Sequence, residues 1–120
     1  MGDLFEMSLL KEIEPIKTKD FLQEKFREYY RSADIMLPPR FTAREWGFLN
    51  WGGGVMNRHV RFSTVNEIKA YLEKTAPAHS YHSVAYYSDP GSKTMIEKKW
   101  QGADLIFDLD ADHLPEMEDV

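Results

Sequence analysis

The chain has 120 residues, of which 42% are hydrophobic and 13% aromatic, and its net charge is −5 at pH 7. This composition predicts a single folded domain or part of one, and it excludes an intrinsically disordered chain and a strongly basic nucleic-acid binder. The sequence has no cysteine, which excludes disulfides and cysteine-based zinc sites within it, and no apolar run approaches the roughly 18 residues of a membrane span.

The first predicted element is a helix from Lys17 to Ala33, where aromatic and aliphatic residues recur at helical spacing and charges fill the other face. The prolines of Leu37–Arg40 end any helix. The next stretch, Thr42–Thr64, has aromatic and aliphatic residues on both sides of the triple glycine Gly52–Gly54. This pattern predicts two strands joined by a glycine-rich hairpin.

A second helix is predicted from about Val65 to Lys74, because Thr64 and Glu67 have the spacing of a capping box and a buried stripe follows them. The aromatic and β-branched segment Tyr81–Ser88 favours a strand, and Asp89–Ser92 is typical of a turn.

The last predicted elements are a short strand from Met95 to Trp100 and a clear strand from Ala103 to Ala111. With two helices and about five strands joined by short turns, we expect an α/β fold of the mixed α+β kind, with a largely antiparallel sheet and flanking helices.

Three aspartates mark the last predicted strand. In a strand, alternate residues share a face, so Asp104, Asp108 and Asp110 would lie together on one side. The other side would face the core with Leu105, Phe107, Leu109 and Ala111. Like charges so close repel each other unless a cation lies between them, and hard carboxylate oxygens suit Mg²⁺ or Mn²⁺. The pattern favours a divalent-metal site of the kind used in phosphoryl transfer.

Three other interpretations of the aspartates stay open at this point. The first is a solvated acidic tail. The second is an EF-hand loop with Asp108, Asp110 and Asp112 at positions 1, 3 and 5, although His113 replaces the usual glycine and Asp119 the usual glutamate. The third is a phosphatase that forms an aspartyl phosphate, although such enzymes place this motif at the start of the domain.

Four segments, taken together, indicate a resemblance to a known protein family. They are Arg44–Phe48, Asn57–Phe62, Ser83–Pro90 and Asp104–Leu114. In this order and at these separations they resemble the catalytic small subunit of archaeal and eukaryotic DNA primases, with an archaeal leaning. The resemblance covers most of the chain, from roughly Phe26 onwards.

The resemblance implies a primase-polymerase catalytic core that makes short primers on single-stranded DNA from nucleoside triphosphates, with Mg²⁺ or Mn²⁺ as cofactor. Asp108 and Asp110 would be metal-binding catalytic carboxylates, and Glu45 would belong to the active site. Arg58 would bind a nucleotide phosphate. Asp112 would be an auxiliary ligand at best.

Simpler interpretations of the same residues remain. Glu45 and Arg58 are also placed to form a plain cross-strand ion pair. Trp46 and Phe48 are expected in the core, and Gly52–Gly54 is expected to be a flexible turn rather than a phosphate loop.

The histidines and lysines carry weaker signals. In a regular strand His59 would face away from Arg58, and Lys98 and Lys99 are expected to be solvated, or at most to contact a template backbone. No zinc site is expected from the remaining histidines, His79, His82 and His113.

Members of the family that this sequence resembles have further features that these 120 residues do not contain. A zinc-binding knob and a third catalytic carboxylate would normally follow the acidic strand, so residues 1–120 are expected to be a single partial domain, the N-terminal part of the catalytic domain. We expect zinc only in the missing part, no primer synthesis by these residues alone, a primase large subunit as partner, and a cytoplasmic location with the archaeal replication machinery. The alternative function is a non-catalytic module, derived from a primase, that binds nucleic acid or protein.

Overall fold

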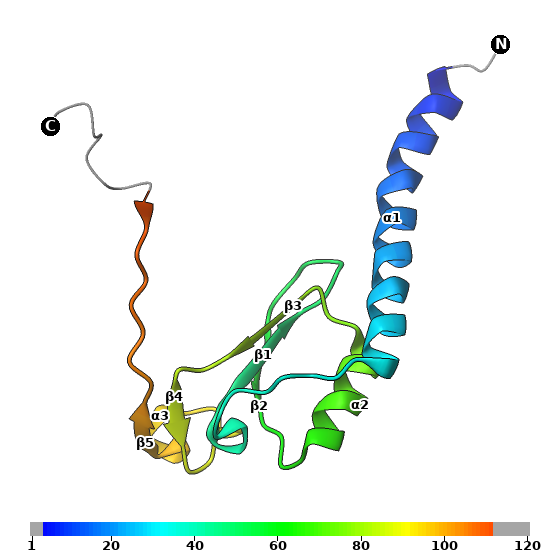
Figure 1. Cartoon of the computed structure of the whole chain (residues 1–120). Coiled ribbons are helices and arrows are strands. Elements are labelled where there is room, and N and C mark those ends of the chain that lie inside the picture. The colour runs from blue at the N-terminus through cyan, green and yellow to red at the C-terminus, as the bar shows by residue number, and fades with distance from the viewer. Residues whose placement is uncertain (1–3, 112–120) are drawn as a thin grey trace, which may run out of the picture.

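The computed structural model describes the backbone of residues 4–111 and the side chains of residues 17–111. The described elements confirm the mixed α/β class, with antiparallel strand pairs beside helices (Figure 1). None of the described helices is long and apolar enough to cross a membrane. In chain order the elements are α1 (Leu4–Ser32), η1 (Phe41–Ala43), β1 (Trp46–Leu49), β2 (Asn57–Val60), α2 (Val65–Thr75), β3 (His79–His82), β4 (Ala85–Tyr87), α3 (Met95–Lys98) and β5 (Trp100–Ala103).

Helix α1 is longer than predicted, because it begins at Leu4 rather than Lys17 and continues through Pro15. Its C-terminal part packs against α2, while its N-terminal part projects beyond the rest of the molecule (Figure 1). Gln23 Nε2 donates to the carbonyl of Thr75 at 3.2 Å, and Arg27 Nε donates to the carbonyl of Glu73 at 3.2 Å. These bonds satisfy carbonyls at the end of α2 that have no partner within the helix.

The central sheet has the order β2-β1-β3, with both pairs antiparallel. The predicted hairpin is confirmed: β1 and β2 flank the glycine run, and Gly53 and Gly54 adopt positive φ angles of 78° and 97°. The β1–β2 pairing is irregular, because Trp46 pairs with Val60 but Phe48 pairs with Asn57. This shift is a β-bulge in β2, and it changes the direction in which the bulged side chains point.

The core lies between the central sheet and α2. Trp46 and Phe48 are buried as predicted, and they pack with Phe62, Ile68 and Leu72. The predicted second helix is also confirmed as α2, together with its cap. The Thr64 side chain accepts from the backbone N–H of Glu67 at 3.2 Å, and the Glu67 carboxylate accepts from the backbone N–H of Ser63 at 2.9 Å.

The single strand predicted for Tyr81–Ser88 is wrong, because the chain forms two strands that belong to different sheets. β3 pairs with β1, whereas β4 pairs with β5, and the break falls at Ser83. The Ser83 hydroxyl accepts from the backbone N–H of Glu45 at 3.0 Å and donates to the carbonyl of Ala85 at 2.7 Å. A serine side chain that bonds the backbone in this way competes with the ladder of a continuous strand.

The short strand predicted for Met95–Trp100 is also wrong. Met95–Lys98 forms the one-turn helix α3, whose cap is Thr94, with its hydroxyl accepting from the backbone N–H of Glu97 at 3.2 Å. Lys99 then adopts a left-handed conformation with φ 57°, which ends the helix and leads into β5.

The strand predicted for Ala103–Ala111 ends much earlier, because β5 stops at Ala103. Its pairing with β4 finishes with a bond from the Asp104 N–H to the carbonyl of Val84 at 2.9 Å. We call residues 104–110 the acidic segment; it runs away from the sheets as an extended chain (Figure 1). The predicted core positions Leu105, Phe107 and Leu109 are 84%, 77% and 91% exposed. A strand needs pairing with a neighbouring strand and a covered apolar face. Beyond Asp104 the acidic segment belongs to neither of the described sheets, and its apolar side chains are exposed.

Candidate functional site

The candidate site is built around the carboxylate of Glu45, at the residue before β1. The side chain is only 12% exposed, and its two oxygens have different partners. Oε2 accepts a hydrogen bond from Arg58 Nη2 at 3.0 Å. Oε1 lies 3.0 Å from both Lys98 Nζ and His59 Nδ1. We call Glu45, Arg58, His59 and Lys98 the Glu45 cluster.

The bulge in β2 explains how two consecutive residues reach the same carboxylate. Neighbouring side chains of a regular strand point to opposite faces, which is why His59 was expected to face away from Arg58. The strand is not regular: His59 has a φ of 60°, a conformation that non-glycine residues seldom adopt. Both side chains therefore contact Glu45, because the regular strand on which the expectation for His59 depended is not formed.

Lys98 is the most unexpected member of the cluster, since it is buried rather than solvated. The residue is 1% exposed, and α3 directs its side chain inward. Its ammonium donates to the carbonyl of Ser92 and lies 2.7 Å from His59 Nδ1 and 3.0 Å from Glu45 Oε1. Polar atoms of three residues thus surround the ammonium, which is the condition for burying such a charge.

The electrostatic balance keeps Glu45 ionised. Burial raises the pKa of the Glu45 carboxyl, but the contacts and charges of Lys98 and Arg58 outweigh burial and hold the pKa below its ordinary value of 4.5. Oε1 is buried without a well-directed hydrogen bond, although two nitrogens are near it.

A pH-dependent stability follows from this lowered pKa. A carboxylate whose pKa is lower in the folded state stabilises that state above its ordinary pKa, and this contribution disappears as pH falls through the folded-state pKa. We expect Glu45→Gln to reduce the free energy of unfolding most above pH 4.5. The difference from the wild-type chain should shrink at lower pH, as measured by urea unfolding across a pH series.

The exposed Glu97→Gln is the matched control, because it removes the same charge outside the Glu45 cluster. Its effect is expected to stay below about 0.5 kcal/mol throughout the series. A difference between wild type and Glu45→Gln that is constant with pH, or that grows as pH falls, would contradict this account of the carboxylate.

A second charged cluster fixes the start of the acidic segment. Arg44 is 1% exposed; its Nη2 donates to Asp104 Oδ2 at 2.7 Å and its Nη1 to the carbonyl of Ser83 at 2.8 Å. The Tyr86 hydroxyl donates to Asp104 Oδ1. These bonds from Tyr86 and Arg44 lower the pKa of the Asp104 carboxyl, and the bond to Asp104 raises the pKa of Tyr86. Asp104, which sequence periodicity grouped with Asp108 and Asp110, thus has a structural partner of its own.

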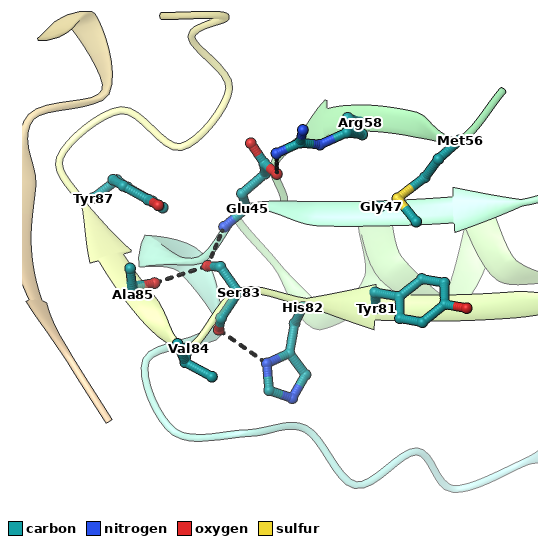
Figure 2. Close-up of a pocket in the computed structure, with 10 residues that line it drawn as sticks. All are labelled: Glu45, Gly47, Met56, Arg58, Tyr81, His82, Ser83, Val84, Ala85 and Tyr87. Atoms are coloured by element: carbon teal, nitrogen blue, oxygen red, sulfur yellow. Dashed lines mark hydrogen bonds and ion pairs between the residues drawn. The ribbon is translucent and has the colours of Figure 1, made fainter. Parts of the chain in front are cut away.

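A cavity of about 610 Å³ opens beside the Glu45 cluster (Figure 2). Glu45 and Arg58 lie on the β1–β2 side of it, and Tyr87 lies across from them on β4. The volume is within the range of ligand sites, roughly 300–1,000 Å³. The remaining lining residues, mostly apolar, are Gly47, Met56, Tyr81, His82, Ser83, Val84 and Ala85.

Only some of the predicted site residues lie close together in the structure. Glu45 and Arg58 are in contact, whereas Asp108 and Asp110 are exposed on the acidic segment, which runs away from β1 (Figure 1). Within residues 17–111, no group of three or more potential ligands lies close enough together to hold a metal ion. The metal role of the two aspartates therefore stays a prediction, and Asp112 lies outside the described residues.

Sequence reasoning missed the roles of Lys98 and His59. A signal for Lys98 was present, because Thr94 and Glu97 have the same capping spacing that identified α2. Recognising that helix would have placed Lys98 in its last turn. Nothing in the sequence indicated the bulge that turns His59 toward Glu45.

Comparison with known proteins gives close relatives, although no family model matches the chain. Proteins named DNA primase small subunit PriS are 53% identical in Methanococcoides burtonii, over 83% of this chain and 26% of that protein, and 49% identical in Methanocella arvoryzae, over 87% and 27%. The protein of that name in Methanothrix thermoacetophila is 53% identical, over 83% and 25%. The chain spans about a quarter of the length of these curated relatives. The resemblance predicted from four sequence segments is confirmed.

Proposed function

We propose that this chain, which is homologous to archaeal DNA primase small subunits over about four fifths of its length, contributes one side of a primase active site. The reaction is the DNA-templated synthesis of short primers from nucleoside triphosphates. The observation that carries the proposal is the ion-paired Glu45–Arg58 unit at the edge of an open cavity. A plain surface ion pair would need neither the burial of Glu45 nor the buried lysine beside it.

Arg58 is the group proposed to bind a nucleotide phosphate. Its side chain is 57% exposed, and Glu45 holds the guanidinium from one side through Nη2. A guanidinium has five N–H donors in a planar fork, so several remain for an anion after Glu45 has taken one. Arginine forks match the geometry of phosphate oxygens.

Asp108 and Asp110 are proposed to bind Mg²⁺ or Mn²⁺. Both are exposed, and residues two apart on an extended chain direct their side chains to the same side. Their hard oxygen donors fit these ions, but two carboxylates are fewer ligands than such an ion takes, so further ligands must come from outside the described residues. When bound, the ions would activate the attacking hydroxyl and neutralise phosphate charge. A structural zinc site is proposed only for protein outside this chain.

The proposed partners follow from the proposed reaction. They are a single-stranded DNA template, nucleoside triphosphates and a primase large subunit, in the cytoplasm of an archaeal cell. The net charge of −5 disfavours tight DNA binding by these 120 residues alone. We also expect these residues alone to make no primers, because the two aspartates lack a third ligand among the described residues.

The proposed function can be tested with a chimera in which this chain replaces the matching segment of the M. burtonii relative, with which it is 53% identical. We expect the chimera to incorporate labelled nucleotides into short primers when a single-stranded DNA template and Mg²⁺ or Mn²⁺ are present. The unfused chain serves as the inactive control. A folded chimera that makes no primer, beside an active parent protein, would contradict the proposal.

The exposure of Asp108 and Asp110 favours one alternative, a non-catalytic module that binds protein or nucleic acid. Under this alternative the chimera makes no primers, just as the unfused chain makes none. The chain nevertheless binds its partner, and this binding needs no added metal. Metal-dependent incorporation by the chimera would therefore separate the two functions.

A further inference from the structure

Lys98 and Arg58 contact different oxygens of the Glu45 carboxylate. The Lys98 side chain is 2% exposed, whereas that of Arg58 is 57% exposed, so the carboxylate is held between an inner and an outer cation. The inner cation contacts Oε1 and the outer cation contacts Oε2. Rotation of the carboxylate would break both contacts at once.

The surroundings of Lys98 fix its ammonium firmly. Its Nζ donates to the carbonyl of Ser92, and it lies 2.7 Å from Nδ1 of His59 and 3.0 Å from Glu45 Oε1. The Tyr87 ring lies 6.0 Å from Nζ. An ammonium with this many polar contacts has little freedom to change its position.

We propose that Lys98 is a positioning residue that fixes the orientation of the Glu45 carboxylate, which in turn holds the Arg58 guanidinium ready for a phosphate group. The phosphate ligand rests on the proposed function, whereas the chain of contacts does not. With both oxygens engaged by cations, Glu45 acts as the holder of Arg58 and not as a metal ligand. The two cations and one carboxylate leave a net positive charge, which favours an anion at the cavity.

The test measures Arg58 directly in the 120-residue chain. The side-chain Nη signals of an arginine are resolved by NMR when an ion pair restricts the guanidinium, and they average when it rotates freely. We expect resolved Arg58 signals in the wild-type chain and averaged signals in Lys98→Met. We also expect Lys98→Met to weaken the binding of inorganic tripolyphosphate about tenfold, the equivalent of one charge-assisted contact.

The neighbouring Lys99→Met is the matched control, because it removes the same charge from an exposed position. It is expected to leave the Arg58 signals resolved and to change tripolyphosphate affinity by less than about twofold. Unchanged Arg58 signals in a folded Lys98→Met variant would overturn the proposal.

A double-mutant comparison covers the case in which Lys98→Met leaves Glu45 unpaired and prevents folding. The variant with both Glu45→Gln and Lys98→Met buries no unpaired charge. If Lys98 acts through Glu45, this variant and Glu45→Gln alone bind tripolyphosphate equally within about twofold. A further loss of tenfold in the double variant would overturn the proposal. If the wild-type chain gives resolved Arg58 signals but binds no tripolyphosphate, the result contradicts the phosphate-binding role of Arg58 in the proposed function. It does not contradict the positioning role of Lys98.

Discussion

The chimeras with Asp108→Asn or Asp110→Asn are expected to synthesise primers at least about a hundredfold more slowly than the unmodified chimera. Asparagine has nearly the same shape as aspartate but lacks its charge, so a lower rate reports the loss of a metal ligand and not a change in packing. Both residues are exposed, and the fold is expected to tolerate the change. The measurement is the initial rate of nucleotide incorporation on a single-stranded template at several Mn²⁺ concentrations.

Asp34→Asn is the matched control, since Asp34 is an exposed aspartate in the loop after α1. Its rate is expected to stay within about twofold of the unmodified chimera. Loss of a metal ligand should also be partly restored by more Mn²⁺, because weaker metal binding is compensated by concentration. Rates within about threefold for both Asp108→Asn and Asp110→Asn would remove these residues from the reaction.

Replacing Arg44 by methionine is expected to lower the free energy of unfolding of the chain by about 3–5 kcal/mol. The guanidinium is buried and donates to the carbonyls of Pro39 and Ser83, to the Tyr86 hydroxyl and to the carboxylate of Asp104. Methionine fills part of the space but donates to none of these groups. Urea unfolding of the two proteins measures the difference.

Arg61→Met is the matched control for Arg44→Met. It removes the same positive charge from a side chain that is not buried, so it shows how much of the loss in stability comes from charge alone. Arg61 forms an ion pair with Asp89 at 3.3 Å, and both side chains are about half exposed. Its replacement is expected to cost under about 1 kcal/mol. Equal effects of Arg44→Met and Arg61→Met would mean that the buried bonds of Arg44 stabilise the fold no more than an exposed ion pair does.

The parts of the fold that follow from local chemistry were predictable. Helix α2 has both its apolar stripe and its capping residues within one short stretch, and the glycine run defines the β1–β2 hairpin. The burial of Trp46 and Phe48 followed from alternation along β1. In each case neighbouring residues carry the information, so no knowledge of the rest of the chain was needed.

The wrong predictions concern elements that depend on distant partners. The residues of β3 and β4 form a continuous strand by composition, but the bonds of Ser83 with Glu45 and Ala85 divide them between two sheets. The acidic segment has strand periodicity, yet it lies beyond the end of β4 and pairs with no described strand. Periodicity shows which residues prefer to share a face, and only the tertiary structure decides whether that face is covered.

The candidate site was predictable through Glu45 and Arg58, which the family resemblance identified and the structure brings into contact. Lys98 was not, because a lysine is buried only where several acceptors converge on it. Here they come from the residue before β1, from β2 and from the turn before α3. That convergence is a property of the folded chain alone.

We propose that Asp108 and Asp110 bind a divalent metal as a pair in a site for nucleotidyl transfer. The decisive measurement is a Mn²⁺ titration of the 120-residue chain, followed by NMR, with Asp108→Asn titrated in parallel. We expect selective broadening of the backbone signals of Asp108 and Asp110 at the lowest Mn²⁺ concentrations, and loss of this broadening in the variant. Broadening confined to Glu116–Asp119, and unchanged in Asp108→Asn, would show that these two aspartates do not bind the metal.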